Sequence, residues 1–168
     1  LQLSYLGYPG ATYLKSVPGW LGDTTLFGQL SPEQRDHACL ELDGGYMAFP
    51  RPAEAPEPRR LGPLRVRFGS FNHSRKLTDA TLQLWGRLMQ RAPKAELVLK
   101  SMSFLEQEER QRIEKRCESS GIPRDRLVVL PWAADLGEHL SQYNQIDLAL
   151  DPMPYGGATT TAEALWMG

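Results

Sequence analysis

Short apolar runs and longer mixed segments alternate along residues 64–168. The apolar runs are rich in Leu, Val and Phe and predict strands, at 64–71, 95–101, 126–132 and 146–151. The segments between them predict helices, at 77–92, 104–120 and 136–143. In the first of these helices, one side carries the apolar residues Leu82, Trp85, Leu88 and Met89. Strands that alternate with helices predict parallel βαβ units with right-handed crossovers in an open, doubly wound, Rossmann-like α/β sheet.

The first 49 residues carry weaker signals. Apolar and polar residues alternate over 1–5 and predict a strand, which runs into the turn sequence Gly-Tyr-Pro-Gly at 7–10. This stretch is either a plain tight turn or one wall of a ligand pocket. Ser31 and Gln34 are spaced as in a capping box and predict the start of a short helix. A further strand is expected at 38–42, before two glycines.

A proline-rich segment separates these two regions. Residues 50–63 carry five of the 13 prolines and almost no apolar side chains. Such a composition favours an extended, semi-rigid chain that cannot form a core. The sequence therefore predicts one unit at 1–49, a linker at 50–63 and a second unit at 64–168.

Composition and charge exclude some classes of function. The 168 residues carry a net charge of -1, with 41% hydrophobic and 23% charged residues, so we expect no nucleic-acid or membrane partner. No apolar run approaches the roughly 20 residues of a membrane span. Cys39 and Cys117 stand far apart, which suits a reducing, cytoplasmic environment. The chain starts without Met and ends within a helical pattern, which favours a piece of a longer protein.

Ligands of open parallel sheets bind outside the carboxyl ends of the strands, near the switch in strand order. The loops that follow the four predicted strands are therefore the candidate ligand loops. They lie at 72–76, 101–103, 131–134 and 151–161.

The last of these loops has the chemistry of a phosphate site. Thr159, Thr160 and Thr161 stand at a predicted helix start, where hydroxyls and unpaired backbone N–H groups favour an anion. Gly156 and Gly157 would let a ligand approach the backbone closely. The alternative is a threonine that only caps the helix after a glycine turn.

Lys76 follows the first strand of the second region and is the candidate cation for the same phosphate. Its alternative role is that of a solvated surface lysine. The chain has neither GxGxxG nor GxxxxGK[ST], so any nucleotide phosphates would be held by Lys76 and the threonine loop. His73 and His139 have no partner at metal-ligand spacing, so we expect no metal site. Glu163 could accept hydrogen bonds from ribose, or could simply favour the first helical turn.

Together these segments resemble the catalytic region of the O-linked N-acetylglucosaminyltransferase and SPINDLY-like family, in its bacterial form. The resemblance covers most of 1–10 and 64–168 and is weaker between them. The matching segments are SYLGYPG (4–10), FGSFNHSRKLT (68–78), LWGRLM (84–89), GIPRDRLVVL (121–130), EHL (138–140) and DPMPYGGATTTAEALWMG (151–168). Members of the family often carry tetratricopeptide repeats, which are absent here but are expected elsewhere in a parent chain.

The resemblance implies a GT-B glycosyltransferase, in which two Rossmann-like halves hold a sugar nucleotide in a cleft. Residues 1–49 would be the tail of the first half, and 64–168 an incomplete second half that binds the donor. The family's diphosphate-binding lysine falls on Lys76, and its phosphate-loop hydroxyls fall on Thr159 and Thr160.

The remaining family positions concern the nucleoside. The acidic residue that binds ribose falls on Glu163, the backbone that contacts uracil on Ala134, and a base-stacking histidine on His139. A donor-contacting glutamine of the family is His73 here, and the family's phosphate-loop histidine is Ala158. These departures concern the nucleotide and the sugar more than the fold.

The implied reaction is metal-independent and needs no cofactor besides a UDP-sugar donor. A sugar, N-acetylglucosamine by resemblance, passes to a Ser or Thr hydroxyl of an acceptor protein while Lys76 and the threonine loop stabilise the departing diphosphate. Two other hypotheses stay open. One is a non-catalytic Rossmann-like nucleotide-binding or interaction module, and the other is a GT-B transferase that uses another sugar nucleotide.

Overall fold

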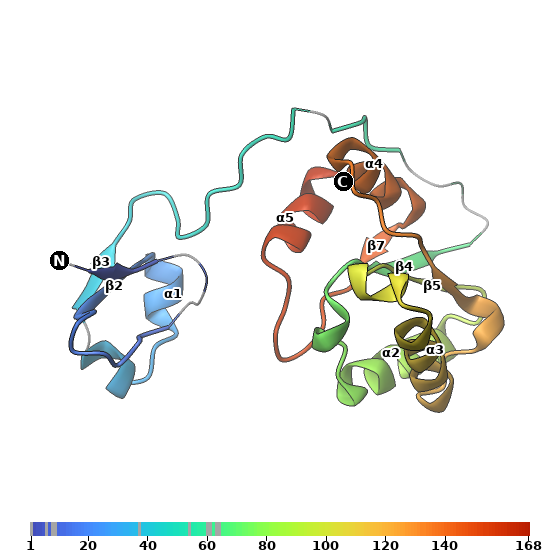
Figure 1. The fold of residues 1–168 in the computed structure, drawn as a ribbon, viewed down its shortest axis with the longest axis horizontal. Coiled ribbons are helices and arrows are strands. Elements are labelled where there is room, and N and C mark those ends of the chain that lie inside the picture. Colours follow the sequence, from blue (N-terminus) through green and yellow to red (C-terminus); the bar gives the residue numbers. More distant parts are fainter. Residues whose placement is uncertain are drawn as a thin grey trace. The chain divides into compact units, whose positions relative to one another are not determined.

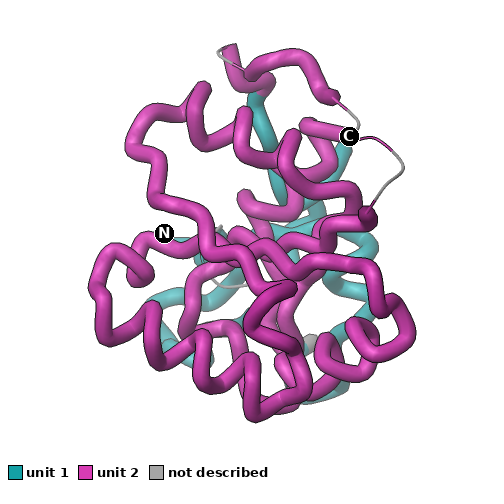
Figure 2. Tube along the Cα trace, turned by 90° about the vertical axis from the view of Figure 1, so that its right-hand side faces the viewer, with its two compact units in different colours: residues 1–50 teal, residues 51–168 magenta. Residues whose placement is uncertain are grey.

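The computed structural model describes the whole chain except Leu1, Leu6, Tyr8, Pro9, His37, Glu54, Arg60, Leu61, Pro63 and Leu64. The chain forms two compact units, Leu1–Pro50 and Arg51–Gly168 (Figure 2). The division falls where the proline-rich segment begins, and the described residues of 51–63 form no helix or strand. The role of this segment as a linker between two halves stays a prediction.

The first unit is a small parallel sheet in the order β1-β2-β3. Its strands are β1 (Leu3–Ser4), β2 (Gly19–Gly22) and β3 (Ala38–Glu41), with α1 (Thr24–Gly28) and the 3-10 helix η1 (Glu33–Asp36) between the last two. β1 is shorter than the strand predicted at 1–5, and two residues of the predicted turn at 7–10 lie outside the described part.

The capping box of the first unit forms as predicted. The Ser31 backbone N–H donates to Gln34 Oε1 at 3.0 Å, and the Gln34 N–H donates to Ser31 Oγ at 3.4 Å. The strand β2 was not predicted, because its sequence Gly-Trp-Leu-Gly lacks an alternating pattern. The strand needs glycine at its start, since a Cβ on Gly19 would lie 2.9 Å from the Ala38 carbonyl oxygen of β3.

The second unit contains the predicted open parallel sheet. Its strands are β4 (Arg67–Ser70), β5 (Glu96–Leu99), β6 (Leu127–Val129) and β7 (Leu148–Ala149), in the order β6-β5-β4-β7. All neighbours pair in parallel, with Phe68 opposite Leu97 on one side and opposite Leu148 on the other. β7 is only two residues long, against the six residues predicted at 146–151.

Helices cover both faces of this sheet (Figure 1). The helices α2 (Asp79–Arg91) and α3 (Gln107–Ser119) lie on one face, and α4 (Leu136–Ser141) and α5 (Thr159–Trp166) lie on the other. The connections contain the 3-10 helices η2 (Ser74–Lys76), η3 (Met102–Leu105), η4 (Arg124–Arg126) and η5 (Gln142–Gln145). The helix predicted at 104–120 is in fact η3 followed by α3, with Glu106 in an extended conformation between them.

Each face of the sheet has its own apolar core. On the α2 and α3 face, the predicted residues Leu82, Trp85 and Met89 are buried, and Leu88 packs at the edge of the same cluster. On the α4 and α5 face the core contains Phe71, Val98, Leu130, Leu140, Tyr143 and Met167. Burying a side chain of this size stabilises the fold by about 1.5–3 kcal/mol, so the two cores hold the strand ends in fixed positions.

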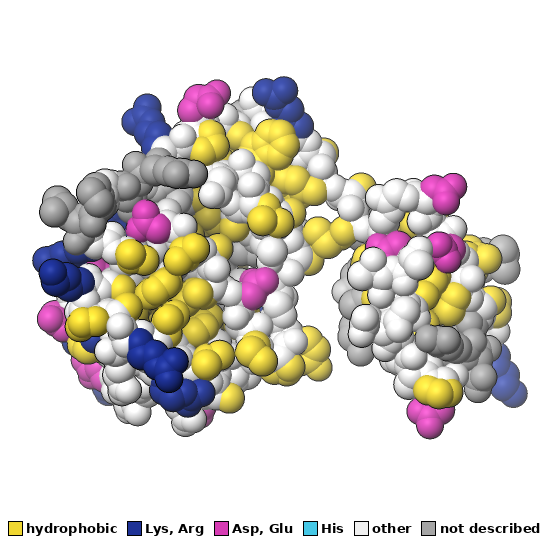
Figure 3. Space-filling model, turned by 180° about the vertical axis from the view of Figure 1, so that it is seen from behind, with side chains coloured by type: hydrophobic (Ala, Val, Ile, Leu, Met, Phe, Trp, Pro, Cys, Tyr) yellow, Lys and Arg dark blue, Asp and Glu magenta, His cyan; other side chains and the backbone are white. Residues whose placement is uncertain are grey.

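Several large apolar side chains of the second unit stay exposed. Leu148 on β7 is 54% exposed, and Leu165 on α5 is 78% exposed. Hydrophobic side chains also gather on the face of this unit that Figure 3 shows. No helix in the described part of the chain combines the length and apolar character needed to cross a membrane.

Candidate functional site

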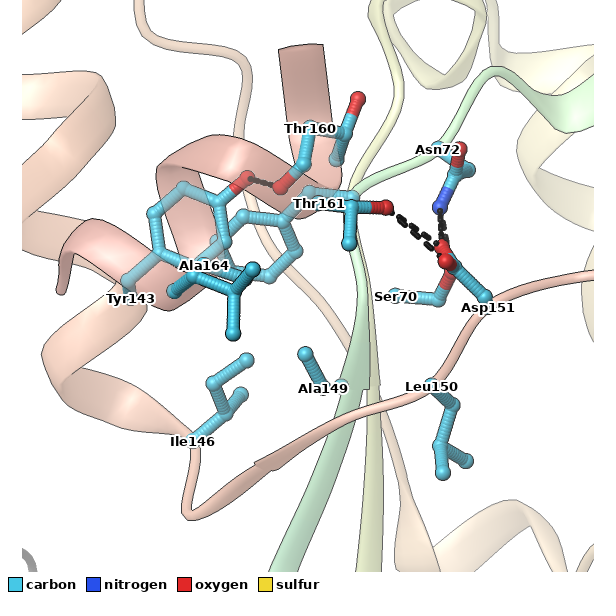
Figure 4. Close-up of a pocket in the computed structure, with 13 residues that line it drawn as sticks. Ser70, Asn72, Tyr143, Ile146, Ala149, Leu150, Asp151, Thr160, Thr161 and Ala164 are labelled. Carbon is cyan, nitrogen blue, oxygen red and sulfur yellow. Dashed lines mark hydrogen bonds between the residues drawn. The ribbon is translucent and has the colours of Figure 1, made fainter. Parts of the chain in front are cut away.

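The strand order of the second unit reverses between β4 and β7. β4 leads to β5 on one side, whereas β7 pairs with β4 on the other, so the loops after these two strands diverge. Such a switch point is where open parallel sheets bind ligands. At the two strand ends, Asn72 donates from Nδ2 to Asp151 Oδ1 at 3.2 Å, which joins the loops at their base (Figure 4).

The loop after β7 is fastened to the start of α2 by two threonines. Thr81 donates from its hydroxyl to the Met153 carbonyl at 2.9 Å and accepts from the Met153 N–H at 3.0 Å. Thr78, the N-cap of α2, donates to the same carbonyl at 3.1 Å. These contacts were not predicted from the sequence.

Lys76 reaches the same loop. Its Nζ donates to the Gly156 carbonyl at 2.8 Å, so the ammonium group lies beside the glycines that precede α5. This contact is solvent-exposed, and a phosphate arriving at the loop could therefore compete for the ammonium. The predicted proximity of Lys76 to the threonine loop is present in the structure, while its role with a ligand stays a prediction.

Asp151 stabilises the loop between β7 and α5 by hydrogen bonds within it. Its carboxylate accepts from the Gly157 N–H at 3.1 Å and from the Thr161 hydroxyl at 2.8 and 3.1 Å (Figure 4). A Cβ on Gly157 would lie 2.5 Å from Thr161 Oγ1 and 3.0 Å from Asp151 Oδ1. Gly157 is thus needed for contacts within the loop itself, and its predicted contact with a ligand stays a prediction.

The three threonines at the start of α5 differ in the hydrogen bonds of their hydroxyls. The helix α5 begins at Thr159, as predicted, but its N-cap is Ala158, and no side chain caps it. The alternative that a threonine merely caps this helix is therefore wrong. Thr161 is bound to Asp151, whereas the hydroxyls of Thr159 and Thr160 have no hydrogen bond within the described part of the chain. These two hydroxyls and the first N–H groups of α5 are available to an anion.

His139 of α4 and Glu163 of α5 form a contact between these two helices. His139 Nε2 lies 2.9 Å from Glu163 Oε2, and the Tyr143 hydroxyl shares its proton between the same oxygen at 3.2 Å and the Thr160 carbonyl at 3.1 Å. The two side chains of this pair are only 16% and 13% exposed. Burial, followed by the nearby Glu163 carboxylate, raises the pKa of Tyr143, so its hydroxyl stays protonated and can donate.

Lys100 completes this group and was missed in the sequence analysis. It follows β5 and is 1% exposed, and its Nζ lies 2.6 Å from His139 Nδ1. Burial lowers the pKa of Lys100 to about 8, against the opposing effect of Glu163 and Glu138. The available signal was a lysine directly after an apolar strand, at the edge of the sheet where ligands bind.

The other two predicted site residues make local contacts. His73 is exposed and accepts the Arg75 N–H at its Nδ1 at 3.2 Å, which caps η2. Ala134 is exposed in the loop that precedes α4, next to the N-cap residue Asp135. Their contacts with a nucleotide stay predictions.

A cavity of about 160 Å³ lies between β7, the start of α5 and η5 (Figure 4). Its apolar wall includes Ile146, Ala149 and Ala164, and its polar end includes Asn72, Asp151, Thr160 and Thr161. Sites for small organic ligands commonly enclose about 300–1,000 Å³, so this cavity is smaller than a typical site of that kind. Within the described residues, no group of three or more His, Cys, Asp or Glu is placed to hold a metal ion.

The chain is similar to known proteins in sequence and in fold. The model of glycosyl transferase family 41 matches residues 60–168. A probable UDP-N-acetylglucosamine–peptide N-acetylglucosaminyltransferase SPINDLY of Arabidopsis thaliana is 31% identical over 172 residues, which cover 100% of this chain and 19% of the relative. A UDP-N-acetylglucosamine–peptide N-acetylglucosaminyltransferase of Caenorhabditis elegans is 31% identical over 101 residues, covering 60% of this chain and 8% of its own length. The chain thus spans about a fifth of the first of these relatives.

The fold has a solved counterpart. A lysine-to-methionine variant of the Thermobaculum terrenum O-GlcNAc transferase superposes with a TM-score of 0.86 at 27% identity, covering 99% of this chain and 32% of that one. This likeness confirms the predicted GT-B type fold with its Rossmann-like parallel sheet. It also confirms the resemblance drawn from the sequence motifs.

Proposed function

We propose that this chain, which belongs to glycosyl transferase family 41, forms the donor-binding part of an enzyme that transfers a sugar from a UDP-sugar to protein. The sugar is N-acetylglucosamine and the acceptor group is a Ser or Thr hydroxyl. The names of its relatives from Arabidopsis thaliana and Caenorhabditis elegans support this choice. One observation carries the proposal. Lys76 Nζ donates to the carbonyl of Gly156, three residues before the start of α5 at Thr159, although 80 residues separate Lys76 from Gly156 in sequence.

The arrangement suits a departing diphosphate. In the transfer, the acceptor oxygen forms a bond to the anomeric carbon while the bond from that carbon to the diphosphate oxygen breaks. Negative charge grows on the leaving diphosphate, and the Lys76 ammonium and the amino end of α5 would stabilise it. The acceptor proton passes to a base outside the residues assigned here, and no metal ion is needed to balance the step.

Glu163 would hold the ribose. Its Oε2 accepts from Tyr143 and lies within hydrogen-bond distance of His139, while Oε1 has no bond among the described residues. A free carboxylate oxygen beside the start of α5 can accept from ribose hydroxyls. Trp132 and His139, whose rings lie 6.2 Å apart at a tilt of 52°, offer apolar surface for the base near Ala134.

A transferase of the same fold with another sugar nucleotide is the second candidate. It is favoured by the exposed, locally bonded His73 and by Ala158, which has no side chain to reach a phosphate. Both positions differ from the family pattern at the donor, so they bear on the nucleotide and not on the fold.

Calorimetry with nucleoside diphosphates tests the proposal. UDP, GDP and ADP are titrated into the full-length protein that carries this sequence, and turnover is then measured with the sugar derivatives of the nucleotide that binds. We expect binding of UDP and transfer from UDP-N-acetylglucosamine to a protein acceptor. Preference for GDP or ADP would support the second candidate. Absence of binding to all three would leave a non-catalytic module.

A further inference from the structure

A buried lysine lies beside the nucleoside part of the proposed site. Lys100 directly follows β5, and its Nζ lies 5.0 Å from the centre of the Phe71 ring and 5.6 Å from that of Trp132. Its Nζ is 2.6 Å from His139 Nδ1. Burying an ammonium group is costly unless it is paired, so a lysine in this position calls for an explanation.

The contact with His139 decides where the histidine carries its proton. A charged ammonium group can only donate hydrogen bonds, so His139 Nδ1 must accept and cannot hold a proton. The neutral ring then has its proton on Nε2, which lies 2.9 Å from Glu163 Oε2 and donates to it. The three side chains form a directed chain, Lys100 to His139 to Glu163.

We propose that Lys100 is a positioning residue that keeps His139 neutral, with its proton on Nε2, and thereby orients Glu163 toward the donor ribose. This inference rests on the proposed function, because Glu163 is taken as the ribose contact. In this arrangement Glu163 Oε2 is occupied by His139 and Tyr143, and Oε1 is left for the ligand. Without the Lys100 ammonium group, His139 Nδ1 would have no donor among the described residues, and the ring could carry its proton on either nitrogen.

The charges around Lys100 agree with this role. Burial lowers its pKa to about 8, while Glu163 on α5 and Glu138 on α4 act in the opposite direction. The group is therefore mostly charged at about pH 7 and mostly neutral at about pH 9. A neutral amine can accept as well as donate, so the control over His139 is expected to weaken as the pH rises through about 8.

Nitrogen-15 NMR of the histidine rings tests the inference directly. The 168-residue chain has three histidines, and a His139→Gln variant assigns the relevant signals. At about pH 7, where Lys100 is mostly charged, we expect Nδ1 of His139 to be unprotonated in the wild type, whereas a measurable share of the rings should carry a proton on Nδ1 in Lys100→Met. The control is Lys94→Met, which replaces an exposed lysine in the turn before β5 and should match the wild type.

Two further measurements keep the test decisive. In the wild type, the Nδ1 shift should change with a midpoint near pH 8, which needs no variant that might misfold. In the full-length protein, Lys100→Met should weaken UDP binding about fivefold, the scale of one lost hydrogen bond, whereas Lys94→Met should not. Identical His139 signals in Lys100→Met and wild type would overturn the inference, as would equal UDP affinities of these two proteins. A wild-type protein that does not bind UDP would overturn the proposed function instead, and the ring signals alone would then decide the state of His139.

Discussion

The division of the three threonines at the start of α5 leads to a prediction with an internal control. Replacing Thr159 and Thr160 together by valine removes two hydroxyls that have no partner in the described structure and keeps the β-branched shape. Replacing Thr161 by valine instead removes the hydroxyl that binds Asp151 at 2.8 and 3.1 Å. The first change should weaken ligand binding, and the second should lower the stability of the loop.

The magnitudes follow from these contacts. A hydrogen bond to a charged group contributes about 1.5–3 kcal/mol, and the open position of both hydroxyls favours the lower end of that range. Losing two such bonds to a diphosphate corresponds to about 3 kcal/mol, or roughly a 100-fold weaker affinity for UDP. The free energy of unfolding of the double variant should stay within about 0.5 kcal/mol of the wild type, since no internal contact is lost. Thr161→Val should lower it by about 1 kcal/mol, because the Asp151 contact is exposed.

Two measurements check these values. Calorimetry with UDP on the full-length protein gives the affinities, and urea unfolding followed by circular dichroism gives the stabilities. Equal UDP affinities of the wild type and the Thr159 and Thr160 double variant would refute the phosphate role of the α5 start. A double variant that binds weakly but is also strongly destabilised would show that the hydroxyls act on the fold, contrary to the contacts described.

Three other experiments test the rest of the site and the linker. Lys76→Ala should weaken UDP binding in calorimetry by about 1.5–3 kcal/mol, and full affinity of the variant would remove this lysine from the site. Gly157→Ala should lower the free energy of unfolding by about 1–3 kcal/mol, because its Cβ would lie 2.5 Å from a threonine hydroxyl. The control Gly156→Ala meets its nearest atom at 3.4 Å and should be nearly neutral in the same urea titration. Limited proteolysis should cut first within 50–63, and first cuts within 95–130 would contradict a linker there.

The order of elements in the second unit could be predicted because it depends on local patterns. Apolar runs and helix ends, such as Gly121 with its φ of 85°, are encoded by neighbouring residues. The first unit was harder to predict, since β2 is four residues long, with a glycine at each end, and owes its formation to pairing with β1 and β3. Element lengths were overestimated for the same reason, as in β7, where pairing with β4 involves only two residues.

The sequence by itself determined the βαβ order, the start of α5 near Thr159 or Thr160 and the family motifs, all of which are properties of contiguous segments. Only the tertiary structure decided which side chains share a contact. It placed Lys76 on Gly156 and Lys100 on His139, pairs that lie 80 and 39 residues apart along the chain. It also separated Thr161, held by Asp151, from two threonines that look identical in sequence. The physical reason is that a hydrogen-bond partner is chosen by distance and direction in space, which depend on strand order and core packing, and no local pattern of residue types encodes them.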